Sequence, residues 1–202
     1  MSTPAVDLDA YAAAPRDAAT LAARREALLD QMGWLEDEAL ALGPLLGALP
    51  PWAVDQAPLP TDLSVRDTFA ALAALDRDVF SAWFDAAEAP GGAVTLSLSL
   101  PRPLPAPPPT GAPLDVLLAD VAAARRDLRA KAAALAPDAW SRPLVLDGTA
   151  TDLYGAALAL VQHDADRLKE VAYRLHEADV TMRPQTGEPQ PGDAPAGGGT
   201  AP

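Results

Sequence analysis

Four stretches of the sequence carry apolar residues at the spacing of one helix face, and proline or glycine interrupts the chain between them. These stretches cover about 17–42, 64–89, 113–136 and 149–178. A helix of about 25 residues is roughly 38 Å long, which is enough to cross one domain. The pattern therefore predicts an all-α fold, a four-helix bundle with a long proline-rich crossover between its second and third helices.

Three of the four predicted helices begin with recognisable start signals. Two begin with a capping box and one has proline in its first turn, at Ser64 with Asp67, Thr149 with Asp152, and Pro113. The crossover from Ala93 to Ala112 starts with VTLSLSLP, which alternates like a strand, and continues as a polyproline-type stretch. We expect it to span the bundle, either with a strand-like piece packed on the helices or as an isolated extended segment.

Composition limits the class of protein. With 202 residues and 50% hydrophobic content, the chain is long enough for one well-buried domain, which we place at 17–178. Residues 1–16 are expected to be a flexible N-terminus, and 179–202, rich in proline and glycine, a disordered tail.

The net charge of −13 makes nucleic acid and anionic membrane surfaces unfavourable partners. The chain has no cysteine, which excludes disulfides, thiolate metal sites and cysteine nucleophiles. The N-terminal stretch MSTPAVDLDAY has acids where a secretory signal needs basic residues and then an apolar run. We therefore expect a cytoplasmic protein without a transmembrane segment.

Three charged residues fall within the apolar stripes. Asp164 lies near the middle of the stripe in VQHDADRLKEV, Asp76 shares a face with apolar residues of the second helix, and Arg125 does so in the third. A carboxylate buried without a partner is costly, so two inward acids favour an inward arginine. The sequence predicts that these three side chains converge in one partly buried polar cluster. The alternative is that Asp76 and Arg125 mark the rims of their stripes and reach solvent.

Other polar residues are expected at the edge of this cluster. His163 and Arg167 flank it on the fourth helix, and Arg24 or Arg25 of the first helix could join it. For His163, a hydrogen-bonded structural role is the alternative to a ligand or base. The four tryptophans are expected to pack within the bundle and its links, at Trp34, Trp52, Trp83 and Trp140.

The order of these elements resembles the DinB/YfiT-like superfamily of four-helix bundles. The resemblance covers roughly residues 17–178 and is carried by LSVRDTFAALAALDRDVF (63–80), by DGTATDLYGAALALVQHDADRL (147–168), and by a link rich in tryptophan and proline between the first two helices. It implies a bundle that often holds a divalent metal and often forms homodimers. Thiol-dependent transferases or isomerases and stress-associated proteins occur among its members.

The resemblance also implies three histidine ligands for the metal. Carried onto this sequence, the ligand positions fall at Ala71, His163 and Arg167, so that one ligand of the three remains. A methyl group cannot coordinate a metal, and a guanidinium adds a positive charge where the metal would sit. We therefore predict no metal or other cofactor. A divalent metal held by Asp76 or Asp164 beside His163 is the less favoured alternative.

Three functions remain open from the sequence. The first is a metal-free DinB-like protein, related to stress or damage, that binds a small polar or anionic ligand through Arg125 and Arg167. The second is a thiol-dependent transferase or isomerase in which His163, with Asp164 or Asp76, acts as general base. The third is a structural homodimeric bundle that binds no ligand.

Overall fold

The computed structural model describes residues 16–59, 62–88, 96–101, 104–107 and 111–182. Within these ranges the chain is mostly helical, with one small three-stranded sheet. The predicted flexible N-terminus, 1–16, lies outside them except for Arg16. Residues 179–182 of the predicted tail, 179–202, belong to the last helix, which ends at Met182. The rest of the tail lies outside the described ranges.

The first long helix, α2, spans Ala18–Ala41, close to the predicted 17–42. Asp17 caps its start by accepting a hydrogen bond from the amide of Thr20 at 3.0 Å. Two short helices follow, α3 at Gly43–Gly47 and α4 at Pro51–Asp55, and each has proline in its first turn. Together they turn the chain into the second long segment.

That second segment is helical from Val65 to Glu88, but it is not uniform. It consists of α5 (Val65–Leu75), a π-helical turn η1 (Asp76–Phe80) and α6 (Ser81–Glu88). Ser64 caps α5, accepting from the amide of Asp67 at 3.0 Å, in agreement with the capping box. The π-helical turn was not predicted, and it begins at Asp76, one of the inward acids.

The remaining long helices are α7 (Leu114–Ala134) and α9 (Leu153–Met182), with the short helix α8 (Pro137–Trp140) between them. Pro113 stands just before α7, where its missing amide hydrogen is not needed. The predicted cap at Thr149 is wrong, because that residue begins a strand. The carboxylate of Asp152 caps α9 instead, accepting from the amide of Gly155 at 3.1 Å.

A small three-stranded sheet, which the all-α prediction did not include, accompanies the helices. It contains β1 (Leu96–Leu98), β2 (Pro143–Leu146) and β3 (Thr149–Asp152), with β1 parallel and β3 antiparallel to β2. Asp147 and Gly148 have φ angles of 49° and 83°, and two positive values in succession are typical of a tight turn between antiparallel strands. The strand-like pattern predicted in the crossover is thus β1, whereas the hairpin was not expected.

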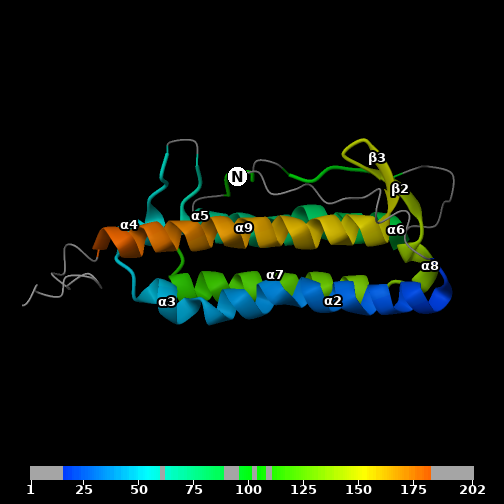
Figure 1. Ribbon diagram of the computed structural model, residues 1–202, viewed down its shortest axis with the longest axis horizontal. Helices are drawn as coiled ribbons and strands as arrows, with labels where there is room; N and C mark the ends of the chain where they lie inside the picture. The colour runs from blue at the N-terminus through cyan, green and yellow to red at the C-terminus, as the bar shows by residue number, and fades with distance from the viewer. Residues whose placement is uncertain (1–15, 60–61, 89–95, 102–103, 108–110, 183–202) are drawn as a thin grey trace, which may run out of the picture.

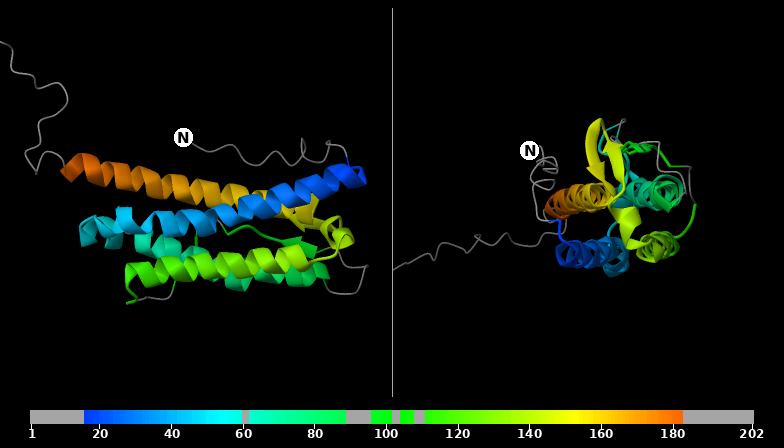
Figure 2. Two further views of the ribbon diagram at one scale, coloured as in Figure 1. Left: turned by 90° about the horizontal axis from the view of Figure 1, so that it is seen from below. Right: turned by 90° about the vertical axis from the view of Figure 1, so that its right-hand side faces the viewer.

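The four long helical segments lie side by side, as the end-on view in Figure 2 shows, with α2 and α7 in one layer and α5–α6 and α9 in the other. In this arrangement α7 lies diagonally opposite α9. The sheet and α8 lie at the α6 end of the helices (Figure 1). No helix in the described part of the chain is long and apolar enough to cross a membrane.

The core consists of two apolar clusters, one toward each end of the helices. The cluster near the sheet contains Leu75, Phe80 and Leu128, and the other contains Leu72 and Val121. Along α5–η1 the two clusters meet next to the buried Asp76, and along α7 they meet at the buried Arg125. The polar cluster described below therefore separates the two halves of the core.

Candidate functional site

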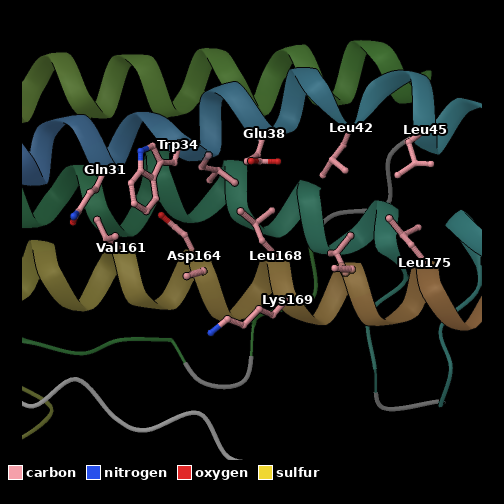
Figure 3. Close-up of a pocket in the computed structure, with 14 residues that line it drawn as sticks. Gln31, Trp34, Glu38, Leu42, Leu45, Val161, Asp164, Leu168, Lys169 and Leu175 are labelled. Atoms are coloured by element: carbon pink, nitrogen blue, oxygen red, sulfur yellow. The ribbon is translucent and has the colours of Figure 1, made fainter.

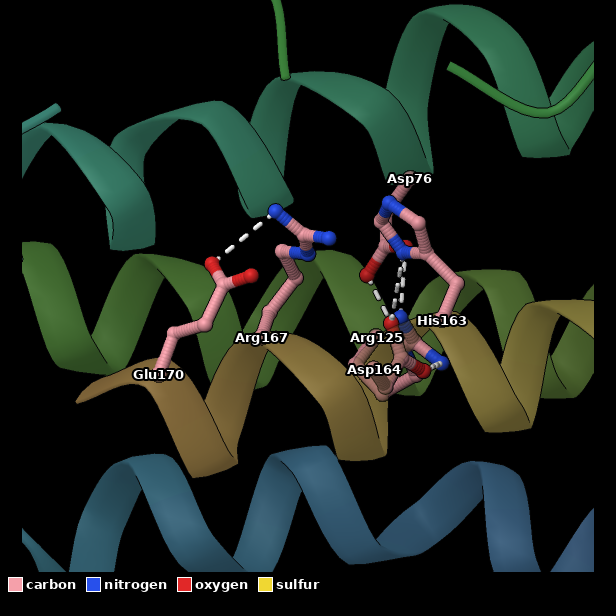
Figure 4. Close-up of polar contacts among 6 residues, drawn as sticks. All are labelled: Asp76, Arg125, His163, Asp164, Arg167 and Glu170. Atoms are coloured by element: carbon pink, nitrogen blue, oxygen red, sulfur yellow. Dashed lines mark hydrogen bonds and ion pairs between the residues drawn. The ribbon is translucent and has the colours of Figure 1, made fainter. Parts of the chain in front are cut away.

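Asp76, Arg125 and Asp164, here called the triad, meet in the core from three different helical segments. Arg125 on α7 donates from Nε and Nη2 to the two carboxylate oxygens of Asp76 on η1, at 2.9 and 2.8 Å. Its Nη1 donates to Oδ2 of Asp164 on α9 at 2.6 Å. Figure 4 shows the guanidinium between the two acids. The structure thus places all three residues together, as the apolar stripes predict.

The triad is almost wholly shielded from water. The side chains of Asp76 and Arg125 are 0% exposed and that of Asp164 is 8% exposed. Charges at such depth need partners, because taking an ion out of water costs several kcal/mol. Both carboxylate oxygens of Asp76 accept from the planar guanidinium of Arg125, and such two-point pairs are among the strongest hydrogen-bonded ion pairs in proteins. Asp76 and Arg125 therefore do not reach solvent from the rims of their apolar stripes.

Burial and charge act in opposite directions on these groups. Desolvation raises the pKa of Asp76 to about 7, because it outweighs the attraction of Arg125, and the negative charge of Asp164 adds to the rise. Burial alone would lower the pKa of Arg125, but the two carboxylates outweigh it and raise that pKa. The guanidinium therefore stays protonated, while Asp76 is close to its titration point at neutral pH.

One oxygen of the triad is left over. Oδ2 of Asp164 accepts from Arg125, but Oδ1 is buried and has no hydrogen-bond partner among the described residues. Nδ1 of His163 lies 3.7 Å from Oδ1, which is too long for a hydrogen bond. A buried carboxylate oxygen without a donor is unfavourable. Asp164 is consequently the member of the triad with unused hydrogen-bonding capacity.

His163 lies at the edge of the triad, as predicted, but it is not held by hydrogen bonds. Its side chain is 1% exposed, and neither ring nitrogen has a hydrogen-bond partner within the described part of the chain. The ring packs edge-on against Phe80, with the two ring centroids 5.9 Å apart. The π-helical turn that carries Asp76 also carries Phe80, so one irregularity of the second segment supplies contacts to both His163 and Arg125.

Two of the other arginines proposed for the cluster, Arg25 and Arg167, have partners outside it. Arg167, on the next turn of α9, pairs with Glu170 at 2.9 Å, and within the described part of the chain it forms no hydrogen bond with the triad (Figure 4). Arg25 donates to the backbone carbonyls of Ala133 and Leu135 at the end of α7. The polar cluster is therefore smaller than predicted, because long arginine side chains on the stripe edges find carbonyls and surface acids closer than the core.

The metal site implied by the resemblance does not fit these residues. Ala71 is buried but offers no ligand atom, and the guanidinium of Arg167 stands at the third ligand position. Arg125 already occupies both carboxylate oxygens of Asp76 and Oδ2 of Asp164. Among the described residues, no three side chains of the types His, Cys, Asp and Glu are grouped to hold a metal ion. The chemistry of this site is that of a buried ion pair.

A groove of about 490 Å³ runs between α2 with the start of α3 on one side and α9 on the other. Its walls are mainly apolar, formed by Leu35, Leu42, Leu45, Val161, Leu168 and Leu175. We call it the α2–α9 groove. Asp164 belongs to its wall, and Figure 3 shows the carboxylate pointing from α9 toward Trp34 on α2. Asp164 is therefore the member of the triad that also lines the α2–α9 groove.

Four side chains in the wall of the α2–α9 groove are polar or charged, apart from Trp34, and two of them are acids. Besides Asp164 they include Gln31, Glu38 and Lys169. The side chain of Lys169 points away from Trp34 in Figure 3, and its Nζ lies 4.0 Å from a carboxylate oxygen of Asp166, outside the groove wall. The groove thus offers negative charge to whatever enters it.

The sequence did not identify the α2–α9 groove. Trp83 and Trp140 are buried as expected, but Trp34 is 53% exposed and Trp52 is also exposed, so the packing role predicted for all four tryptophans is wrong for these two. A signal for Trp34 existed, because at 100° per residue it stands roughly 130° from the centre of the apolar stripe of α2. An indole so far from the buried face indicates a surface role.

No family model matches the chain, and neither the curated proteins nor the solved structures contain one that is detectably similar to it.

Proposed function

We propose that the chain is a cytoplasmic, metal-free four-helix bundle of the DinB/YfiT-like kind that binds a small molecule in the α2–α9 groove. The groove carries this proposal: its volume of about 490 Å³ lies within the range of small-molecule sites, and its apolar walls converge on one buried polar group, Asp164. Proteins of this kind include stress-associated members, and a role in stress or damage is part of the proposal.

The contacts favour a ligand other than the anion expected from the sequence. Both arginines proposed as anion contacts are engaged, Arg125 by the two acids of the triad and Arg167 by Glu170. Neither belongs to the wall of the α2–α9 groove. His163, the candidate base of the transferase alternative, is also absent from that wall and is buried, so the geometry supports binding better than catalysis by this residue.

Filling the α2–α9 groove should abolish ligand binding. Ala172 is exposed in the groove wall, and Ala172→Trp would occupy the space without touching the triad. In a thermal-shift screen of small amines, thiols, sugars and organic acids, a ligand present at 100 times its Kd should raise the Tm of the native protein by about 5–10 °C. The same ligand should leave the Ala172→Trp protein unshifted.

Ala130→Trp is the matched control, because Ala130 is an exposed alanine of α7 outside the groove wall. It should keep the full shift. A screen in which nothing raises the Tm, or a hit that stabilises Ala172→Trp equally well, would contradict the proposal.

Metal analysis tests the metal-free part of the proposal separately. After incubation with zinc, nickel or manganese and removal of excess metal, we expect much less than one equivalent bound per chain, because only His163 remains of the ligand set. Elemental analysis by mass spectrometry measures this directly. One tightly bound equivalent that disappears in His163→Ala would establish a metal site and refute this part.

A further inference from the structure

We infer that the α2–α9 groove takes an organic cation, a small molecule with a protonated amine attached to an aromatic or aliphatic body. This inference rests on the proposed binding function and specifies the chemical class of the ligand. It is carried by three features of the groove: a fixed carboxylate oxygen without a donor, an exposed indole beside it, and the sign of the charges around both.

The carboxylate is held in place before any ligand arrives. Arg125 fixes Oδ2 of Asp164 at 2.6 Å, and Oδ1 of the same group is buried without a hydrogen-bond partner in the described ranges. The side chain is 92% buried, since it is 8% exposed, so water reaches it poorly. An ammonium group entering from the groove would supply the missing donor, and hydrogen bonds between charged groups are about twice as strong as neutral ones.

The indole supports the same ligand. Trp34 stands on the opposite wall, half-exposed, and Figure 3 shows its ring beside the carboxylate of Asp164. The face of an indole attracts cations, and a carboxylate together with an aromatic face is a suitable cradle for an amine. Leucine side chains further along the groove would cover the apolar body of the ligand.

Other ligand classes fit less well. An anion would meet Asp164 and Glu38, while Lys169 points away. A metal ion needs several oxygen ligands, and among the described residues no three side chains of the types His, Cys, Asp and Glu are grouped to hold one. A wholly apolar molecule would exclude water and leave Oδ1 of Asp164 without a donor.

Three probes with the same aromatic body and different charge test the inference. The probes are 2-phenylethylamine, 2-phenylethanol and 3-phenylpropionate. At a pH of about 7.5 they are a cation, a neutral alcohol and an anion, and isothermal titration calorimetry measures the affinity of each. We expect the amine to bind at least ~10-fold more tightly than the alcohol, and the carboxylate to bind most weakly.

Variants then assign the effect to residues. Asp164→Asn should weaken amine binding by at least ~10-fold and change alcohol binding little, because only the charge is removed. Asp166→Asn is the matched control and should bind as the native protein does, since Asp166 is outside the groove wall. Trp34→Ala should weaken amine binding several-fold. Because Trp34 is exposed, this second variant remains decisive if Asp164→Asn fails to fold.

Three results would overturn the inference. Equal affinity for amine and alcohol with no effect of Asp164→Asn, or no detectable amine binding, would leave the groove without a preference for cations. The proposed function would survive if another ligand lost binding in Ala172→Trp, and it would fail if none did. A stable dimer that Ala172→Trp dissociates would assign the groove to a second copy of the chain, and this too would overturn the inference.

Discussion

Arg125→Met is expected to lower the free energy of unfolding by about 3–5 kcal/mol at neutral pH. Methionine fills a similar volume, so little packing is lost, but the two acids that Arg125 now contacts would remain buried without a counter-charge. The penalty is therefore electrostatic: it is the cost of keeping Asp76 and Asp164 in a dry core. Urea denaturation followed by circular dichroism measures it.

The adjacent arginine provides the control. Arg126 pairs with Glu36 on the surface, and its side chain is 59% exposed. Exposed pairs contribute at most about 1 kcal/mol, so Arg126→Met should change stability little. If Arg125→Met were as mild as Arg126→Met, the triad would not be a paired buried cluster and the description of the core would be wrong.

Trp140→Ala is expected to be about equally severe, with a loss of about 3–5 kcal/mol. Trp140 is 0% exposed and lies where α8 meets α6 and α9. Its ring centroid is 6.3 Å from that of Phe84 and 5.2 Å from that of Tyr154, and the guanidinium carbon of Arg25 lies 5.8 Å from it. Removing the indole leaves a cavity that these partners cannot close without moving the end of the helices.

Trp34→Ala is the control for Trp140→Ala, because both variants remove a tryptophan but only Trp140 is buried. The half-exposed Trp34 should lose only about 0.5 kcal/mol of stability, as is usual for surface substitutions, while its effect on ligand affinity is retained. Comparable losses for Trp34→Ala and Trp140→Ala would mean that the two side chains are packed alike, contrary to the structure.

The long helices and the triad could be predicted because both follow from helix periodicity. A stripe that repeats over twenty or more residues fixes which face is buried, and a charge in the middle of that face has to be paired inside. Asp164 and Arg125 were identified in this way. The prediction failed for Arg167, because its Nη1 pairs with Glu170, three residues further along α9, and not with the acids of the triad.

The hairpin, the π-helical turn and the groove could not be predicted from the same signal. Strands β2 and β3 are four residues each, too short for alternation to stand out, and the pattern of Thr149 with Asp152 is also typical of a helix cap. A π-helical turn leaves no recognisable sequence pattern of its own. The groove depends on how closely α2 approaches α9, and that distance is set by tertiary packing.

The most direct test is the stability difference between the native protein and Arg125→Met, measured at pH 8 and at pH 5. The pKa of Asp76 is already raised to about 7, so the folded state binds more protons than the unfolded state between about pH 4 and 7 and gains stability as pH falls. Arg125 is the strongest influence that lowers this pKa, and its removal raises the pKa further. Arg125→Met should therefore gain more on acidification, and the difference should shrink at pH 5 by about 1.4 kcal/mol per unit of added pKa. A difference of equal size at both pH values would contradict this, because it would mean that Arg125 stabilises the core by packing and not by its charge.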